Sequence, residues 1–176
     1  MKVTIFCSAS LQGIDPRFDE AARDLVRRLC GAGCEIVSGG TTKGTMKVVA
    51  DTVRDCGGVH IGVIPHFMER FHYPELTSTI WTDTMSERKE KMREGSDAVI
   101  ALPGGIGTLD ELVETITLVK LNCYAGRVVV LDVDGFYAPL RQLLDYFVET
   151  RMLDRETVDK VCFPQSVEQA MECLGL

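Results

Sequence analysis

The chain has 176 residues, 45% of them hydrophobic, which suits one compact domain (1–176) with a substantial core. Its formal net charge is −7 and its pI is near 5.0, which argues against a nucleic-acid polymer as the main partner, because such binding rests on clustered Lys and Arg. No apolar run is long enough to span a membrane, and the first residues become polar too quickly for a signal peptide, so we expect a cytoplasmic protein without a membrane partner.

Short apolar runs alternate with segments of helical periodicity along the first half of the chain. The apolar runs predict strands at 2–7, 35–38, 59–64 and 79–82. Apolar residues at helical spacing predict helices at 16–30, 45–55 and 85–95. Between these elements, the segment 65–78 contains two prolines and no clear period, which predicts a long loop.

The alternation continues in the second half. Apolar runs predict strands at 98–102 and 127–133, and helical patterns follow at 108–124 and 136–150. A further helix is expected from residue 166. Strands that alternate with helices at this spacing predict an α/β fold, in which helices cover both faces of a doubly wound parallel sheet.

Seven cysteines lie along the chain without a CxxC pair or a Cys/His cluster at zinc spacing. Most resemble small core residues of a reducing compartment. The four-residue spacing of Cys30 and Cys34 would also suit a metal or redox pair, but nothing nearby completes a ligand set. His66 and His72 in the predicted loop define no metal geometry either, so we expect no metal site.

Small polar segments follow three of the predicted strands. They are Ser8-Ala9-Ser10, Gly39-Gly40-Thr41 and the turn from Pro103 to Thr108. In an open parallel sheet, ligands bind outside the carboxyl ends of the strands, where the topology switches direction. The three segments therefore predict one nucleotide-sized site, with Ser8, Ser10, Gly39 and Gly40 among the residues that bind the substrate.

The segment 102–111 joins a buried strand, a glycine-rich turn and the start of a helix. Glycines at 104, 105 and 107 allow the backbone to approach a ligand closely, and free N–H groups at a helix start can hold a phosphate. The turn matches neither GxGxxG nor GxxxxGK[ST]. It could also be only a tight connection between a strand and a helix.

Glu111 follows Thr108 by three residues and allows two interpretations. In a capping box, the threonine would cap the helix and the glutamate would return to the backbone N–H of the threonine. In a catalytic site, a carboxylate one turn from a bound phosphate could engage a ribose hydroxyl, stabilise an oxocarbenium ion or activate water. The residues alone leave both interpretations open.

The segment 83–92 is rich in charge, and taken alone it predicts a solvated helix with Met85 and Met92 in the core. Arg88 gains interest beside a phosphoribosyl group, because a planar guanidinium binds oxygen atoms at two points.

Two motifs identify a family. Residues 103–111 match PGGxGTxxE, and residues 85–92 match MxxRKxxM. In these motifs the chain resembles the Lonely Guy family, which comprises cytokinin riboside 5′-monophosphate phosphoribohydrolases that were long labelled lysine decarboxylases. The resemblance implies a Rossmann-like fold and a homodimer with its active site near the subunit interface. It also implies hydrolysis of a nucleoside monophosphate to free base and ribose 5-phosphate, without a cofactor.

The resemblance also assigns roles to residues. It implies that Arg88 and Glu111 form the catalytic pair and that the 5′-phosphate lies on the glycine turn. The residues expected at the substrate or its phosphate are Met85, Lys89, Gly104, Gly105, Gly107 and Thr108.

The chain departs from the family pattern around these motifs. Ser38, Thr41 and Thr45 replace the tyrosine, the third glycine and the leucine of YGGGxxGLM, and Leu118 and Tyr124 lie where the family has a Trp-containing helix end and its histidine. We therefore expect the reaction type to be kept and leave the base open between a cytokinin and adenine or another purine. A non-enzymatic nucleotide or molybdenum-cofactor carrier is the alternative, whereas a lysine decarboxylase is disfavoured because no lysine has a recognisable Schiff-base setting.

Overall fold

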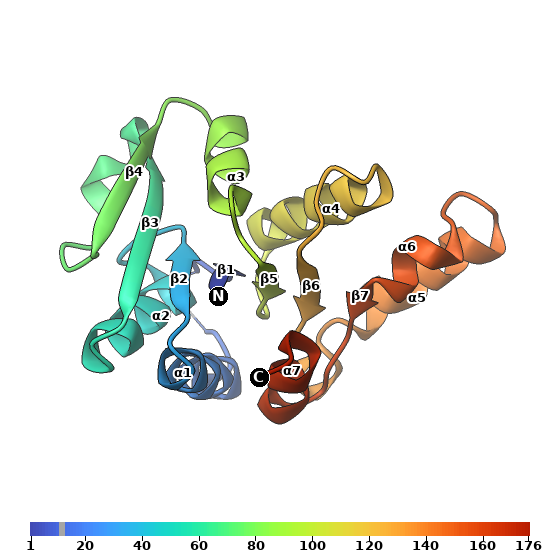
Figure 1. Cartoon of the computed structure of the whole chain (residues 1–176), viewed down its shortest axis with the longest axis horizontal. Helices are drawn as coiled ribbons and strands as arrows, with labels where there is room; N and C mark the ends of the chain where they lie inside the picture. Colours follow the sequence, from blue (N-terminus) through green and yellow to red (C-terminus); the bar gives the residue numbers. More distant parts are fainter. Residues whose placement is uncertain (11–12) are drawn as a thin grey trace.

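The computed structural model describes residues 1–10 and 13–176, and a single sheet of seven parallel strands forms its centre (Figure 1). The strands are β1 (Lys2–Phe6), β2 (Glu35–Ser38), β3 (Val59–Pro65), β4 (Ser78–Thr82), β5 (Ala98–Ala101), β6 (Arg127–Val130) and β7 (Val161–Cys162). Their order across the sheet is β4-β3-β2-β1-β5-β6-β7, and each neighbouring pair is parallel. The predicted α/β fold with a doubly wound parallel sheet is confirmed.

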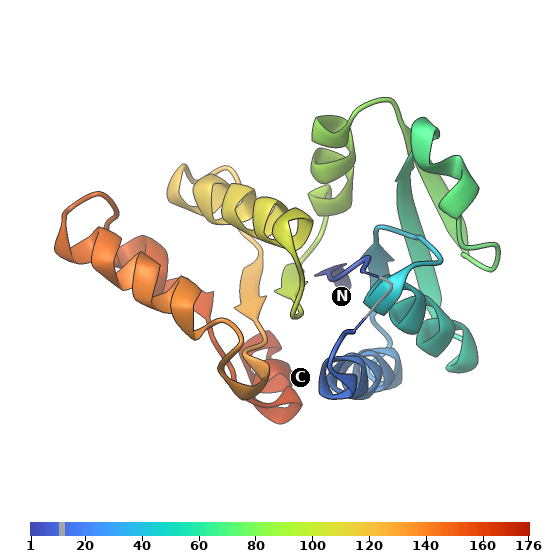
Figure 2. The same cartoon turned by 180° about the vertical axis from the view of Figure 1, so that it is seen from behind.

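Helices cover both faces of the sheet. The α-helices are α1 (Pro16–Gly31), α2 (Gly44–Asp55), α3 (Met85–Arg93), α4 (Ile106–Lys120), α5 (Ala138–Glu149), α6 (Arg155–Asp159) and α7 (Val167–Leu174). One hydrophobic cluster joins α1, α2 and α7 to the sheet, and two others join α3 and the α4–α6 group to its opposite face. Figures 1 and 2 show α1 and α7 side by side, with α3 and α4 on the other side of the sheet.

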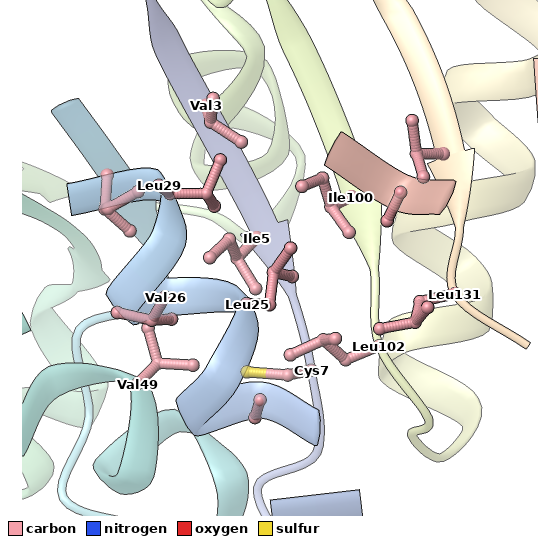
Figure 3. Packing of buried hydrophobic residues seen from close by; sticks show 14 of the residues in the cluster. Val3, Ile5, Cys7, Leu25, Val26, Leu29, Val49, Ile100, Leu102 and Leu131 are labelled. Carbon is pink, nitrogen blue, oxygen red and sulfur yellow. The ribbon is translucent and has the colours of Figure 1, made fainter. Parts of the chain in front are cut away.

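The side chains of the central strand β1 alternate in direction, which explains how this strand contributes to the hydrophobic clusters on both faces of the sheet. Val3 and Ile5 of β1 are fully buried against Leu25 and Leu29 of α1, as Figure 3 shows. Phe6 belongs to the cluster on the opposite face, with Met92 of α3. Successive side chains of a strand point to opposite faces, so an almost wholly apolar strand is expected at the centre of a two-sided sheet.

The direction of the topology switches at β1, because β2 lies on one side of it and β5 on the other. The carboxyl ends of β2, β1 and β5 are therefore neighbours. The segments that follow them are Gly39-Gly40, Ser8-Ala9-Ser10 and the glycine turn at 103–105. The predicted convergence of these three segments at one edge of the sheet is confirmed.

Several element boundaries differ from the sequence predictions. Strand β3 ends at Pro65, one residue later than predicted. A proline fits there because it lacks an N–H group, and the last residue of a strand need not donate a hydrogen bond. The predicted loop after it contains a 3₁₀ helix, η1 (His66–Phe71). The second 3₁₀ helix, η2 (Val133–Gly135), replaces the end of the strand predicted at 127–133. Helix α4 begins at 106 rather than 108 and ends at 120 rather than 124, and the helix predicted at 136–150 spans 138–149.

The last quarter of the chain holds two short elements that no pattern predicted. Strand β7 has two residues and α6 has five. Both are too short for the two-residue period of a strand or the 3.6-residue period of a helix to be recognised in the sequence. Among the residues that the structure describes, no helix is both long and apolar enough to cross a membrane.

His60 is a buried histidine of β3 beside the segment that follows β2. Its Nε2 lies 2.8 Å from the Oγ of Ser38, which accepts a hydrogen bond of 3.1 Å from the N–H of Gly40. Burial lowers the pKa of His60 from 6.5 to about 4. The imidazole is therefore neutral at physiological pH and ties the Gly39-Gly40 segment to the sheet through Ser38.

This burial predicts a specific acid sensitivity. The unfolded chain binds a proton at His60 near pH 6.5 and the folded chain only near pH 4, so the stabilisation is complete above pH 6.5 and is lost as the pH falls toward 4. By pH 4 the loss amounts to about 3 kcal/mol of unfolding free energy. Urea unfolding of the parent and a His60→Gln variant should show this loss in the parent only. A His66→Gln variant, altered on exposed η1, should behave as the parent; parallel curves for parent and His60→Gln would contradict the prediction.

Candidate active site

The glycine turn leads into α4 with a free helix start. Gly105 is the N-cap residue, and within the described ranges no side chain accepts a hydrogen bond from the first turn. The first turn also carries no acidic residue. The N–H groups of Ile106, Gly107 and Thr108 are therefore available, together with the positive end of the helix dipole, for an anion outside the sheet.

The turn itself leaves little room for side chains. A Cβ atom on Gly104 would overlap the Oγ1 of Thr108, which folds back over the turn. Thr108 is buried and lies in the third position of the helix rather than at its N-cap. The capping-box interpretation of Thr108 and Glu111 is therefore wrong, because the helix begins three residues earlier than that interpretation requires.

Glu111 points into the protein toward Arg88 of α3. The Nη1 of Arg88 lies 3.4 Å from Oε1 of Glu111, and both side chains are only 4% exposed. The Nε of Arg88 donates a hydrogen bond of 3.0 Å to the carbonyl oxygen of Val63 in the last part of β3. Two residues 23 positions apart in the sequence thus form a buried ion pair at the carboxyl edge of the sheet.

The Nη2 group of Arg88 is a hydrogen-bond donor that the contacts with Glu111 and Val63 do not use. It is buried and has no hydrogen-bond partner in the part of the chain that the structure describes. Buried polar groups are almost always paired, so this N–H group calls for an acceptor that the chain itself does not supply. A bound substrate oxygen is one such acceptor.

Gly39 makes room for the guanidinium. A Cβ atom at this position would overlap the Nη2 of Arg88 and would lie 2.8 Å from the Sδ of Met46. The glycine that follows β2 therefore acts on Arg88 by its lack of a side chain. Sequence reasoning expected Gly39 at the substrate and did not anticipate this contact.

Burial changes the protonation of the pair. Loss of solvent raises the pKa of Glu111 from 4.5 to about 7, although the charge of Arg88 opposes the rise. Asp110 raises the pKa further, whereas Lys89 and Arg93 lower it. The carboxyl group therefore ionises close to neutral pH, which suits a group that carries or exchanges a proton during a reaction.

Cys7 directly follows β1, and its buried thiol lies near Glu111 and Arg88. Burial raises its pKa well above the usual range, and the charge of Glu111 raises it further. A thiol with a raised pKa stays protonated and reacts poorly.

The remaining predicted residues have varied surroundings. Ser8 is buried and its Oγ accepts a hydrogen bond of 3.0 Å from the N–H of Ser10, which is exposed. Gly40 has φ of +60° and packs against the Cα of Gly62. Met85, predicted to lie in the core, begins α3 and is 41% exposed. Lys89 does not face the glycine turn, because its Nζ lies 2.9 Å from Asp110 and 2.5 Å from Glu114.

Comparisons of the sequence with known proteins identify a family. The model of a protein family described as "Possible lysine decarboxylase" matches residues 46–174. A cytokinin riboside 5′-monophosphate phosphoribohydrolase of Mycobacterium tuberculosis is 34% identical over 174 residues, which cover 96% of this chain and 90% of the relative. One of Arabidopsis thaliana is 39% identical over 150 residues, which cover 84% of this chain and 69% of the relative. This chain belongs to the Lonely Guy family.

The fold alone extends to more distant proteins. A molybdenum cofactor binding protein of Rippkaea orientalis has a structure that matches 99% of this chain and 94% of its own with a TM-score of 0.75, at 20% identity. The Rossmann-like sheet is thus common to the Lonely Guy family and to a protein that is named for a different function. The site, rather than the sheet, has to decide what this chain does.

Proposed function

We propose that this member of the Lonely Guy family hydrolyses the N-glycosidic bond of a purine nucleoside 5′-monophosphate, cytokinin-type or AMP, to free base and ribose 5-phosphate. The observation that supports this most strongly is the buried Arg88–Glu111 pair one helical turn beyond the uncapped start of α4. A phosphate bound at the helix start would place the attached ribose beside the carboxylate of Glu111.

The chemistry follows from that placement. The 5′-phosphate binds the N–H groups of Ile106, Gly107 and Thr108 at the start of α4, with the hydroxyl of Thr108 beside them. The C1′–N bond then breaks, and its electron pair leaves with the base, which takes up a proton. Ionised Glu111 stabilises the positive charge that develops on the ribose ring.

Water completes the reaction. Glu111 accepts a proton from a water molecule whose oxygen bonds to C1′, which yields ribose 5-phosphate. Arg88 offsets the charge of Glu111 and donates its free Nη2 N–H group to a ribose oxygen. We assign Ser8, Ser10, Gly39, Gly40 and Met85 to the walls of the same site. Lys89 of α3 lies at its margin, where its Nζ pairs with Asp110 and Glu114 of α4.

A substrate panel tests the proposal. Purified protein is incubated with AMP, N6-isopentenyl-AMP, CMP and adenosine, and the free base is measured by chromatography. We expect release from at least one purine monophosphate and roughly 100-fold lower kcat/KM for adenosine, because the remote phosphate supplies binding energy that is used in the transition state. No base from any monophosphate would overturn the proposal.

A non-enzymatic nucleotide or cofactor carrier is the second candidate, and the shared fold is the observation that favours it. It predicts tight, stoichiometric binding without turnover. A carrier has no evident use for a buried carboxylate whose pKa lies near 7 beside a ribose, which favours the hydrolase. The seven cysteines present as free thiols support a reducing location, and we place the protein in the cytoplasm.

A homodimer is part of the proposal, and an apolar face supports it. Ile106 and Val113 of α4 are 82% and 44% exposed, and Leu143 and Tyr146 are exposed on the neighbouring α5. Beside the glycine turn, an apolar hollow of about 390 Å³ separates the two helices. Exposed apolar surface of this kind marks an interaction face, and a second copy of this chain would cover it next to the site.

A charge on this face should separate the subunits. We expect Val113→Asp to shift the protein from dimer to monomer in sedimentation or light-scattering measurements, because the carboxylate would be buried without a partner. Phe67→Asp is the matched control, since Phe67 is 65% exposed on η1 at the other edge of the sheet. A dimer that persists in Val113→Asp, or a monomeric parent, would contradict the assignment.

A further inference from the structure

Glu114 joins the two helices that carry the reactive pair. It lies on α4 one turn beyond Glu111, and its Oε2 is 2.5 Å from the Nζ of Lys89 on α3. Its Oε1 is 2.6 Å from the Nη2 of Arg93, one turn further along α3. One carboxylate therefore engages two cations of the opposite helix, each through a separate oxygen.

These contacts are shorter than the contact between the reactive residues themselves. Arg88 and Glu111 are 3.4 Å apart, which is long for an N–H···O hydrogen bond, whereas charge-assisted bonds are about 2.7–2.9 Å. Arg93 is also buried, so its bond to Glu114 is poorly screened by water. The contacts of Glu114 are thus the closer of the two sets of charged contacts that join α3 to α4 at this point.

We infer that Glu114 is a positioning residue for the proposed hydrolase, because it ties Lys89 and Arg93 of α3 to α4 and so holds Arg88 opposite Glu111. This inference rests on the proposed function for its effect on turnover. Its effect on Glu111 does not depend on turnover.

Glu114 also balances charge around Glu111. The charged groups that face Glu111 are Arg88, Lys89 and Arg93 from α3 and Asp110 from its own helix; the protonated Cys7 thiol lies near it at the end of β1. Glu114 neutralises two of these cations. Without its charge, Lys89 and Arg93 would act on Glu111 more strongly and lower its pKa.

Two substitutions separate position from charge. Glu114→Gln keeps the shape and removes the charge, whereas Glu114→Asp keeps the charge and shortens the reach by one methylene group. For Glu114→Gln we expect kcat to fall roughly tenfold or more with KM within about twofold, because Glu114 touches no substrate. Its pH–rate profile should also rise at lower pH than that of the parent. For Glu114→Asp we expect a lower kcat with an unchanged profile.

The titration of Glu111 is read directly by ¹³C NMR of side-chain carboxyl groups, with the resonance assigned by its loss in Glu111→Gln. The apparent pKa should fall by about half a unit or more in Glu114→Gln and stay unchanged in Glu90→Gln, which alters an exposed glutamate of α3. Far-UV circular dichroism and melting temperature verify that each variant is folded.

The outcomes are distinct. A folded Glu114→Gln variant with the parent's kcat and the parent's Glu111 titration would overturn the inference. If the parent itself releases no base, the proposed function fails, and the NMR titration alone decides whether Glu114 tunes Glu111. If Glu114→Gln does not fold, Glu114→Asp decides: unchanged kcat in that variant would also overturn the positioning role.

Discussion

Replacement of Glu111 by glutamine should abolish base release while the protein stays folded and still binds nucleotide. An amide cannot carry the negative charge that offsets the developing ribosyl cation, nor accept a proton from water. We expect kcat to fall by roughly 10³-fold or more, which chromatography of the free base measures. Calorimetric binding of the nucleotide and the melting temperature are the controls, and more than about a tenth of the parent's rate in this variant would contradict the catalytic role.

The rate of base release by the parent protein should depend on pH, because the charge of Glu111 changes with pH. Burial raises the pKa of Glu111 to about 7, and the ionised form is the reactive one. The rate should therefore be low at pH 5, rise through about pH 7 and level off above it. A rate that is already maximal at pH 5 would place the essential ionisation on another group.

Gly39→Ala should disable the site without replacing either reactive residue. The new Cβ would overlap the Nη2 of Arg88 and crowd Met46, so Arg88 has to move away from Glu111. We expect roughly 100-fold lower kcat/KM, since small displacements of a positioned group cost about that much, and a loss of about 1–3 kcal/mol in unfolding free energy from overpacking.

Gly31→Ala provides the matched control for this substitution. Gly31 is the exposed last residue of α1, and a Cβ there meets nothing within 4 Å. Its kcat/KM, measured beside that of Gly39→Ala, should equal the parent's, and its unfolding free energy should rise by up to about 1 kcal/mol, because alanine is favoured over glycine in a helix. Equal activity in Gly39→Ala and the parent would show that Arg88 does not depend on the space that Gly39 leaves.

The sheet could be predicted from the sequence because its signals are local. The run at 98–101 is wholly apolar, and the run at 2–6 is apolar apart from Lys2 and Thr4, which is what a strand covered on both faces looks like. Elements as short as β7 and α6 lack a full period, and the start of α4 depends on an uncapped glycine turn that no side-chain signal marks.

The site could be predicted only in part. The motifs pointed to Arg88 and Glu111, and the structure brings these two into contact. The contacts of Gly39 with Arg88 and of Lys89 with Glu114 arise from tertiary packing between distant segments, and nothing in the local sequence encodes them. The charges of Lys89, Arg93 and Glu114 were visible, but on a charged helix they resemble any solvated face.

Hydrolysis in ¹⁸O-labelled water tests the central claim most directly. Purified protein is incubated with AMP and with N6-isopentenyl-AMP, and the products are analysed by mass spectrometry. Attack of water at C1′ predicts one ¹⁸O atom in ribose 5-phosphate, with none in the released base. Recovery of intact nucleotide bound in stoichiometric amount, with no labelled sugar phosphate, would contradict the hydrolase and favour a carrier.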